Sequence, residues 1–184
     1  DMQGEKPGQT LWIKSASSPI FDTCAFKAAE AAAIKLGADS DADPETGEMT
    51  FADGLCSITE IRDSFIAGDI VREKSYNLSL RNNQFAVRSD APESSRLTTS
   101  GGRIALNETI QNCLWDPTGV KNWRGTLIEG GDHPERSGNL RVTNSQLVGR
   151  LKLIKINRGS AVIEGNRPVA TGGHYGNVFV TIGP

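Results

Sequence analysis

The chain has 184 residues, the size of one ordinary domain, and 37% of them are hydrophobic, which is low for a single compact core. Twenty lysines and arginines against 22 aspartates and glutamates give a net charge of -2, which excludes a general attraction to nucleic acid or anionic lipid. No apolar run reaches the roughly 20 residues that cross a bilayer, so we expect no membrane insertion. This composition favours an elongated protein with a neutral or polar partner.

Residues 1–50 are expected to form an N-terminal helical cap and a polar linker. Asp22 is placed to cap a helix that runs from Cys24 to Leu36, and Gly37 supplies a left-handed stop. Apolar residues of this segment fall near one helical face. We expect the helix to cover the open end of the domain that follows.

Residues 51–184 repeat a short pattern in which an aliphatic residue precedes small polar or turn-forming residues and then another large apolar one. The aliphatic anchors lie 19, 30, 32 and 21 residues apart, which indicates coils of a common minimum length with insertions of different sizes. A further echo relates residues 125–130 to residues 160–165. The anchors are Ile61, Leu80, Ile110, Val142 and Ile163.

The polar residues after each anchor are typical of the corners of a parallel β-helix. Asn, Asp and Gly adopt the unusual backbone angles of such corners at low cost, and stacked Asn side chains can hydrogen-bond along the stack. The aliphatic anchors would stack inside as a continuous core. For the first coil, a short helix is an alternative to a strand, because Ser57-Ile58-Thr59-Glu60 is also a capping box.

These motifs resemble the right-handed parallel β-helix superfamily, the pectin-lyase-like proteins that include polysaccharide lyases, hydrolases and bacteriophage tailspikes. The resemblance covers roughly residues 57–168 and is carried by "TIQNCLWD", "LRVTNSQLVG" and "AVIEGN". It implies a mainly-β solenoid that acts on or attaches to polysaccharide, and a homo-oligomer. The repeated segment is short for a complete enzyme of this group, so the resemblance implies a fragment, a terminal domain or a binding module.

The richest insertion, from Trp115 to Arg136, is the candidate binding site, because insertions of solenoids often project on one face. An exposed indole beside carboxylates and an arginine would suit a sugar ring. The alternative is that the indoles pack under the loop. The candidate ligand-binding residues are Trp115, Asp116, Trp123, Arg124 and His133.

A polysaccharide-cleaving enzyme on the same fold would need an acid and a second carboxylate at a defined separation. Glu129 and Asp132 are the candidate catalytic pair in this insertion. We expect no cofactor and no metal, since the two histidines are far apart in sequence and the acidic run from Asp39 lacks the glycine and glutamate of a calcium loop.

A rival prediction comes from the C-terminal end, where an alternating strand follows a glycine-rich turn at residues 172–182. This segment is similar to the last strand of secreted fimbrial subunits, which are β-sandwiches polymerised by strand donation.

Three functions follow from these patterns. The first is an attachment module of tailspike type on a virion or cell surface, outside the cell, that binds a surface polysaccharide. The second is a polysaccharide-degrading enzyme on the same fold, and the third is a fimbrial or other assembly subunit without catalytic activity.

Overall fold

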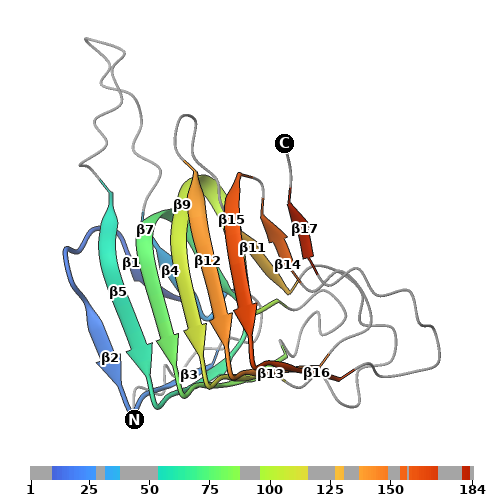
Figure 1. Ribbon diagram of the computed structural model, residues 1–184. Helices are drawn as coiled ribbons and strands as arrows, with labels where there is room; N and C mark the ends of the chain where they lie inside the picture. Colours follow the sequence, from blue (N-terminus) through green and yellow to red (C-terminus); the bar gives the residue numbers. More distant parts are fainter. Residues whose placement is uncertain are drawn as a thin grey trace.

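The computed structural model describes residues 10–27, 32–37, 54–87, 96–115, 127–130, 137–148, 154–156, 158–169 and 180–182, and these ranges are mainly β. Every strand pair in them is parallel (Figure 1). The strands are β1 Leu11–Ile13, β2 Ile20–Asp22, β3 Ala25–Lys27, β4 Ile34–Leu36, β5 Cys56–Arg62, β6 Phe65–Ala67, β7 Ile70–Arg81, β8 Gln84–Ala86, β9 Thr98–Gln111, β10 Leu114–Trp115, β11 Ile128–Gly130, β12 Gly138–Thr143, β13 Gln146–Val148, β14 Ile154–Ile156, β15 Gly159–Glu164, β16 Arg167–Val169 and β17 Val180–Ile182.

The strands belong to two large parallel sheets, one of 11 strands and one of 6. The larger sheet contains two stacks: a first stack in the order β1-β4-β7-β9-β11-β14-β17, and a second stack in the order β2-β5-β7-β9-β12-β15. The long strands β7 and β9 belong to both. The smaller sheet is a third stack, β3-β6-β8-β10-β13-β16. Successive segments of the chain therefore visit the three stacks in the same order.

A continuous apolar row runs through the second stack, and it consists of the predicted anchors. Ile61 pairs with Leu80, Leu80 with Ile110, Ile110 with Val142, and Val142 with Ile163. The first four are fully buried. The predicted repeat is thus confirmed, because anchors separated by 19 to 32 residues in sequence are direct neighbours in space. Phe21 on β2 extends the row by one strand.

Each anchor is followed two residues later by a corner with a left-handed backbone. Positive φ angles between 50° and 53° occur there, at Thr23, Asp63, Asn82, Asn112 and Asn144, and Gly165 takes the last corner with φ 62°. Asn and Asp tolerate this conformation better than most residues. The backbone N–H of each of the five non-glycine corner residues donates to a carbonyl on the next segment, as Asn82 N does to Gln111 O at 3.0 Å. The corner asparagines therefore have the unusual backbone angles that the sequence predicted.

The residue after each corner supplies a second set of hydrogen bonds on the inner side. The Asn83 amide donates to Ile61 O at 2.7 Å, and its oxygen accepts from Ser64 N at 3.0 Å. Asn166 repeats both contacts with Val142 O and Ser145 N, at 2.7 and 2.8 Å. The buried Asn83 amide and the partly buried Asn166 amide thus satisfy backbone groups that would otherwise lose their partners at the corner.

The predicted helix from Cys24 to Leu36 is wrong. Ala25–Lys27 and Ile34–Leu36 are strands, β3 and β4, that pair with β6 and β7. The pairing buries Phe26, Ile34 and Leu36, and this tertiary packing outweighs the helix-forming tendency of an alanine-rich segment. Gly37 does have a positive φ of 84°, but its role is close packing, since a Cβ there would clash with the backbone of Lys74.

Three other expectations are corrected by the pairing. Residues 128–130 pair with residues 154–156, whereas residues 160–164 pair with residues 139–143, so the echo between 125–130 and 160–165 does not mark equivalent positions. The capping box at Ser57 lies in strand β5 and starts no helix. The C-terminal strand β17 is parallel to β14, which does not fit the β-sandwich of the fimbrial alternative.

One ion pair lies inside the larger sheet. Arg72 Nη1 on β7 is 3.1 Å from Glu108 Oε2 on β9, and both side chains are buried. Burial raises the pKa of the Glu108 carboxyl, and the adjacent Arg72 guanidinium opposes that shift. Arg72 Nη2 also donates to Asn107 O at 3.0 Å. Removing either partner would leave a buried charge uncompensated.

The stacked apolar row predicts the cost of a core truncation. Ile110→Ala should lower the free energy of unfolding by about 2–5 kcal/mol, because it removes a fully buried side chain between Leu80 and Val142. The midpoint of urea unfolding measures this loss. Val162→Ala, at an exposed position of β15, should change stability by less than about 0.5 kcal/mol, and similar losses for both variants would contradict the observed arrangement.

The left-handed backbone at Asn112 predicts that its alanine and glycine variants differ in stability. Asn112→Ala and Asn112→Gly both lose the hydrogen bond from the Asn112 amide to Asn82 Oδ1, but only alanine resists φ 52°. Asn112→Ala should therefore be the less stable variant, by about 1 kcal/mol, in thermal or urea unfolding. Equal stability of the two variants would show that the backbone angle does not limit this corner.

Candidate functional site

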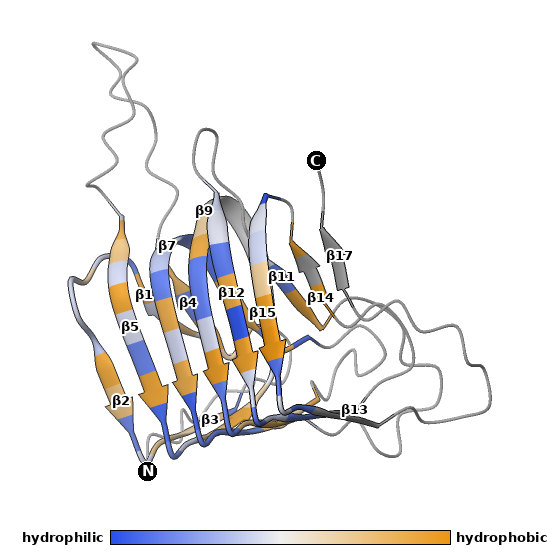
Figure 2. Cartoon of the chain, viewed as in Figure 1, coloured by the Kyte–Doolittle hydropathy of each residue, from blue (hydrophilic) through white to orange (hydrophobic). Residues whose placement is uncertain are grey.

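The outward side of the second stack presents polar side chains on each of its strands. Six strands lie side by side there, and hydrophobic and hydrophilic residues alternate along them (Figure 2). On β7, for example, Leu78 and Leu80 are buried, whereas Asn77 and Arg81 are exposed. We call the outward side chains of β2, β5, β7, β9, β12 and β15, with the corners that follow these strands, the ladder face.

A row of polar side chains, mostly amides, crosses the ladder face at positions five residues before the corners. The Asn107 amide donates to Asn77 Oδ1 at 2.9 Å, and Asn77 in turn donates to Ser57 O at 3.2 Å. Asn139 N donates to Asn107 Oδ1 at 3.1 Å, and the Ser160 hydroxyl donates to Asn139 Oδ1 at 2.7 Å. Neighbouring side chains therefore hold each other in fixed orientations across five strands.

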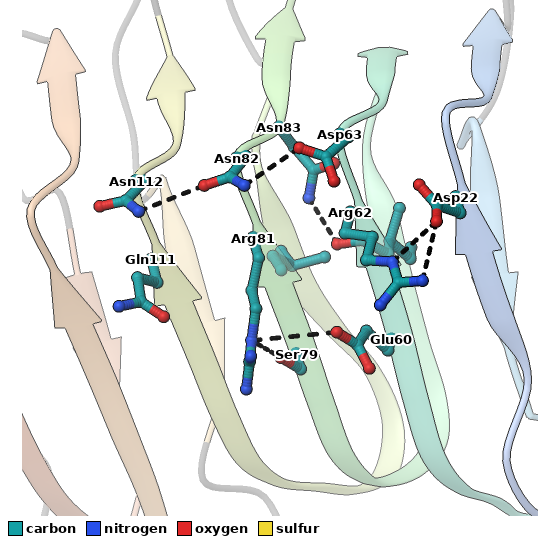
Figure 3. Close-up of polar contacts among 12 residues, drawn as sticks. Asp22, Glu60, Arg62, Asp63, Ser79, Arg81, Asn82, Asn83, Gln111 and Asn112 are labelled. Carbon is teal, nitrogen blue, oxygen red and sulfur yellow. Dashed lines mark hydrogen bonds and ion pairs between the residues drawn. The ribbon is translucent and has the colours of Figure 1, made fainter.

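A second amide row follows the corners. The Asn112 amide donates to Asn82 Oδ1 at 3.2 Å, and the Asn82 amide donates to Asp63 Oδ1 at 3.0 Å (Figure 3). Both donors point toward the same end of the stack, and the row ends on a carboxylate. The bond to Asp63 is charge-assisted and therefore the stronger kind. This row orients exposed amides along the edge of the ladder face.

At the β2 end of the face, an arginine is held by a carboxylate. Arg62 Nε and Nη2 both donate to Asp22 Oδ2, at 2.9 and 2.8 Å (Figure 3). The hydrogen bonds from Arg62 are the main reason that the pKa of Asp22 is lowered, and Asp22 likewise raises the pKa of Arg62. Arg62 is therefore engaged within the protein although its side chain is 43% exposed.

Two other arginines of the face have weaker partners. Arg81 Nε lies 4.0 Å from Glu60 Oε1 and donates to the Ser79 hydroxyl at 3.2 Å. Arg141 Nη2 lies 3.8 Å from Glu164 Oε2. The side chains of Arg81 and Arg141 are 53% and 62% exposed. Exposed ion pairs of this length contribute little, so both guanidinium groups can exchange these partners for another anion.

Apolar residues also reach the surface of this face. Ile20 on β2 and Ile58 on the adjacent strand β5 are 59% and 53% exposed. Both lie on the outward side at the end of the stack that carries the Asp22–Arg62 pair. The ladder face thus combines hydrogen-bonding amides, charges and a small apolar area.

The structure describes only two of the sequence-predicted site residues, and both lie outside the ladder face. Trp115 on β10 is fully buried, with a relative exposure of 0%, because it pairs in register with Phe85 in the third stack. This burial favours the packing alternative for Trp115 over stacking on a sugar. Glu129 lies on β11 in the first stack, where its Oε2 accepts a hydrogen bond from Arg96 Nη1 at 3.1 Å.

The remaining predicted residues, Asp116, Trp123, Arg124, Asp132 and His133, lie outside the described residues. The proposed carboxylate pair of Glu129 and Asp132 therefore has no measured separation. Prediction from sequence also missed the ladder face. A usable signal existed, since Asn77 and Asn107 are 30 residues apart, the same interval as their neighbours Leu80 and Ile110.

In the described ranges, no group of three or more His, Cys, Asp or Glu side chains is arranged to hold a metal ion. Within the same ranges, no helix has the length and apolar character needed to cross a membrane.

No protein-family model, curated protein or solved structure matches this chain. The class of the protein therefore rests on its own structure, which is mainly β with large parallel sheets.

The three cysteines are free thiols, and they differ in exposure. Cys113 is buried between segments of the stack, and burial raises its pKa to about 11. Burial also raises the pKa of Cys56. Cys24 is partly exposed. Neither Cys56 nor Cys113 is suited to act as a nucleophile, because the thiolate is the reactive form.

These environments predict which thiol reacts first. At pH 8, Cys113 should be almost entirely protonated and Cys56 shielded, so a disulfide reagent should label Cys24 fast and the other two only after unfolding. The release of the coloured thiolate measures each phase, and Cys24→Ser should abolish the fast one. Fast labelling of the Cys24→Ser variant would contradict the burial of Cys56 and Cys113.

Proposed function

We propose that this chain is a short right-handed parallel β-helix that attaches to polysaccharide through its ladder face. Successive segments visit three parallel stacks in a constant order, and a repeated apolar row lies inside, which is the pattern of a solenoid. Right-handedness is supported by the general rule that about 98% of parallel crossover connections have this hand.

The observation that carries the binding proposal is the pair of exposed amide rows. Each amide has donor and acceptor groups, and a hydroxyl group both donates and accepts, so an amide array is suited to a partner rich in hydroxyls. The rows repeat at the strand spacing of roughly 4.8 Å, which gives an extended polymer equivalent contacts along the stack. Internal hydrogen bonds hold the amides in place, so little side-chain freedom is lost on binding.

The apolar area of the face supports the same partner. Sugar rings present an apolar side as well as a polar rim, and Ile20 and Ile58 offer exposed apolar contacts beside the amides. A polypeptide partner would also use amide contacts, but in the described residues the unpaired strand edges of the second stack lie at its two ends, on β2 and β15, so a peptide that extended the sheet would not cover the amide rows.

An attachment role fits a protein displayed outside the cell, on a virion or cell surface, as a homo-oligomer. Weak contacts to a repeating polymer gain strongly when several copies bind together, because the later binding events are intramolecular. Sedimentation equilibrium measures the number of copies.

A glycan array tests the proposal, with Ser79→Trp as the key variant. Ser79 lies in the middle of the ladder face on β7, so an indole there should obstruct a bound polymer and weaken binding at least roughly tenfold. Trp123→Ala is the matched test of the sequence-predicted loop. Loss in Ser79→Trp with retention in Trp123→Ala would assign binding to the ladder face.

The opposite pattern would assign binding to the loop. If the parent protein bound no glycan, the attachment proposal would be contradicted and an assembly subunit would be favoured. Reducing ends are measured on the same samples. New reducing ends that disappear in Glu129→Gln would instead identify the chain as an enzyme.

A further inference from the structure

We infer that the centre of the ladder face holds a subsite for an anionic substituent of the glycan, formed by Arg81, Arg141 and the strand between them. This inference rests on the proposed function and adds the chemical class of the ligand. The shared chemistry is a carboxylate, sulfate or phosphate group carried on a sugar.

The first step is the position of the two arginines. Arg81 on β7 pairs in register with Gln111 on β9, and Arg141 on β12 pairs with Thr109 on β9. The two arginines therefore flank β9 from opposite sides, offset by two residues along the strands. With roughly 4.8 Å between strands and 3.3 Å per residue, their Cα atoms lie roughly 12 Å apart, within the combined reach of two arginine side chains.

The second step is the surface between them. Thr109 and Gln111 point outward from β9, and in the described part of the chain neither side chain has a hydrogen-bond partner. A hydroxyl and an amide are therefore available at the point where the two guanidinium groups can converge. Figure 3 shows Gln111 and Arg81 next to each other on this face.

The third step is the contrast among the three arginines of the face. Arg62 gives two short hydrogen bonds to Asp22, whereas Arg81 and Arg141 lie 4.0 and 3.8 Å from their carboxylates. A guanidinium group prefers two parallel hydrogen bonds to one anionic group. Arg62 already has a close carboxylate partner of this kind, and Arg81 and Arg141 do not.

The carboxylates of Glu60 and Glu164 are part of the same environment and oppose a bound anion. Glu164 is 67% exposed, so its side chain can turn away from Arg141 into solvent. Glu60 is more enclosed and stays near Arg81. The subsite should therefore bind one anionic group at a time and with modest affinity, which suits a polymer that repeats the same group.

Three polymers with one backbone test the inference: dextran, carboxymethyl dextran and dextran sulfate, each cast in a native gel that retards a bound protein. The parent protein should be retarded by one or both anionic polymers and less by dextran, and added salt should weaken the effect. Arg81→Gln and Arg141→Gln should each reduce retardation roughly tenfold. Carboxymethyl dextran and dextran sulfate distinguish a carboxylate site from a sulfate site.

Arg62→Gln is the matched control, because it removes the same charge from the same face at an arginine that Asp22 already holds. Retardation should persist in this variant, whereas an equal loss in all three variants would reduce the effect to net charge and overturn the subsite. Equal retardation by charged and neutral dextran, or none at all, would also overturn it. The glycan array separates these outcomes from the attachment proposal, which stands if neutral glycans bind and falls if none do.

Discussion

A left-handed residue directly after each strand of the second stack sets the register on which the sheets depend. The φ angles of these corners agree within a few degrees, from 50° to 53° at the five that are not glycine. Because the conformation is the same each time, the N–H of each of these five corners donates to a carbonyl of the following segment in the same way. Strands before and after the corner are then aligned residue by residue, and the apolar row, the inner amides and the ladder face all follow from that alignment.

The repeat could be predicted from the sequence because the residues that define each copy lie close together in the chain. An aliphatic residue two positions before an Asn, Asp or Gly marks where the backbone turns, so the anchors from Ile61 to Ile163 could be aligned without knowledge of the fold. The first four anchors are also buried, whereas Ile163 on β15 is 38% exposed. The prediction failed for the region before Cys56 for the opposite reason, because its structure depends on distant residues. Its alanines favour a helix in isolation, and only the neighbouring strands make Ala25–Lys27 and Ile34–Leu36 extended. Thr23 also turns the first corner, but threonine is not a residue that predicts a left-handed backbone.

The candidate site was harder to predict than the core. Tryptophan and acidic residues are the usual candidates for a sugar-binding site in a sequence. Trp115, however, is a core residue that pairs with the buried Phe85 on the neighbouring strand. Asparagine, serine and threonine form the hydrogen-bonded rows of the ladder face, and their usual interpretation in a sequence is structural. Their importance as a surface comes from stacking alone, since Asn77 and Asn107 meet only when β7 and β9 pair. A single copy of the repeat therefore does not indicate that surface.

The connections between a strand of the third stack and the next strand of the first stack vary in length, but the strands that they join keep their pairing partners. β6 ends at Ala67 and β7 begins at Ile70, whereas β10 ends at Trp115 and β11 begins at Ile128, and the strands on both sides of each connection keep the same register. Length at these positions is thus independent of the architecture. Such a protein can acquire or lose residues there in evolution while its scaffold is conserved, so its outline can diversify faster than its interior.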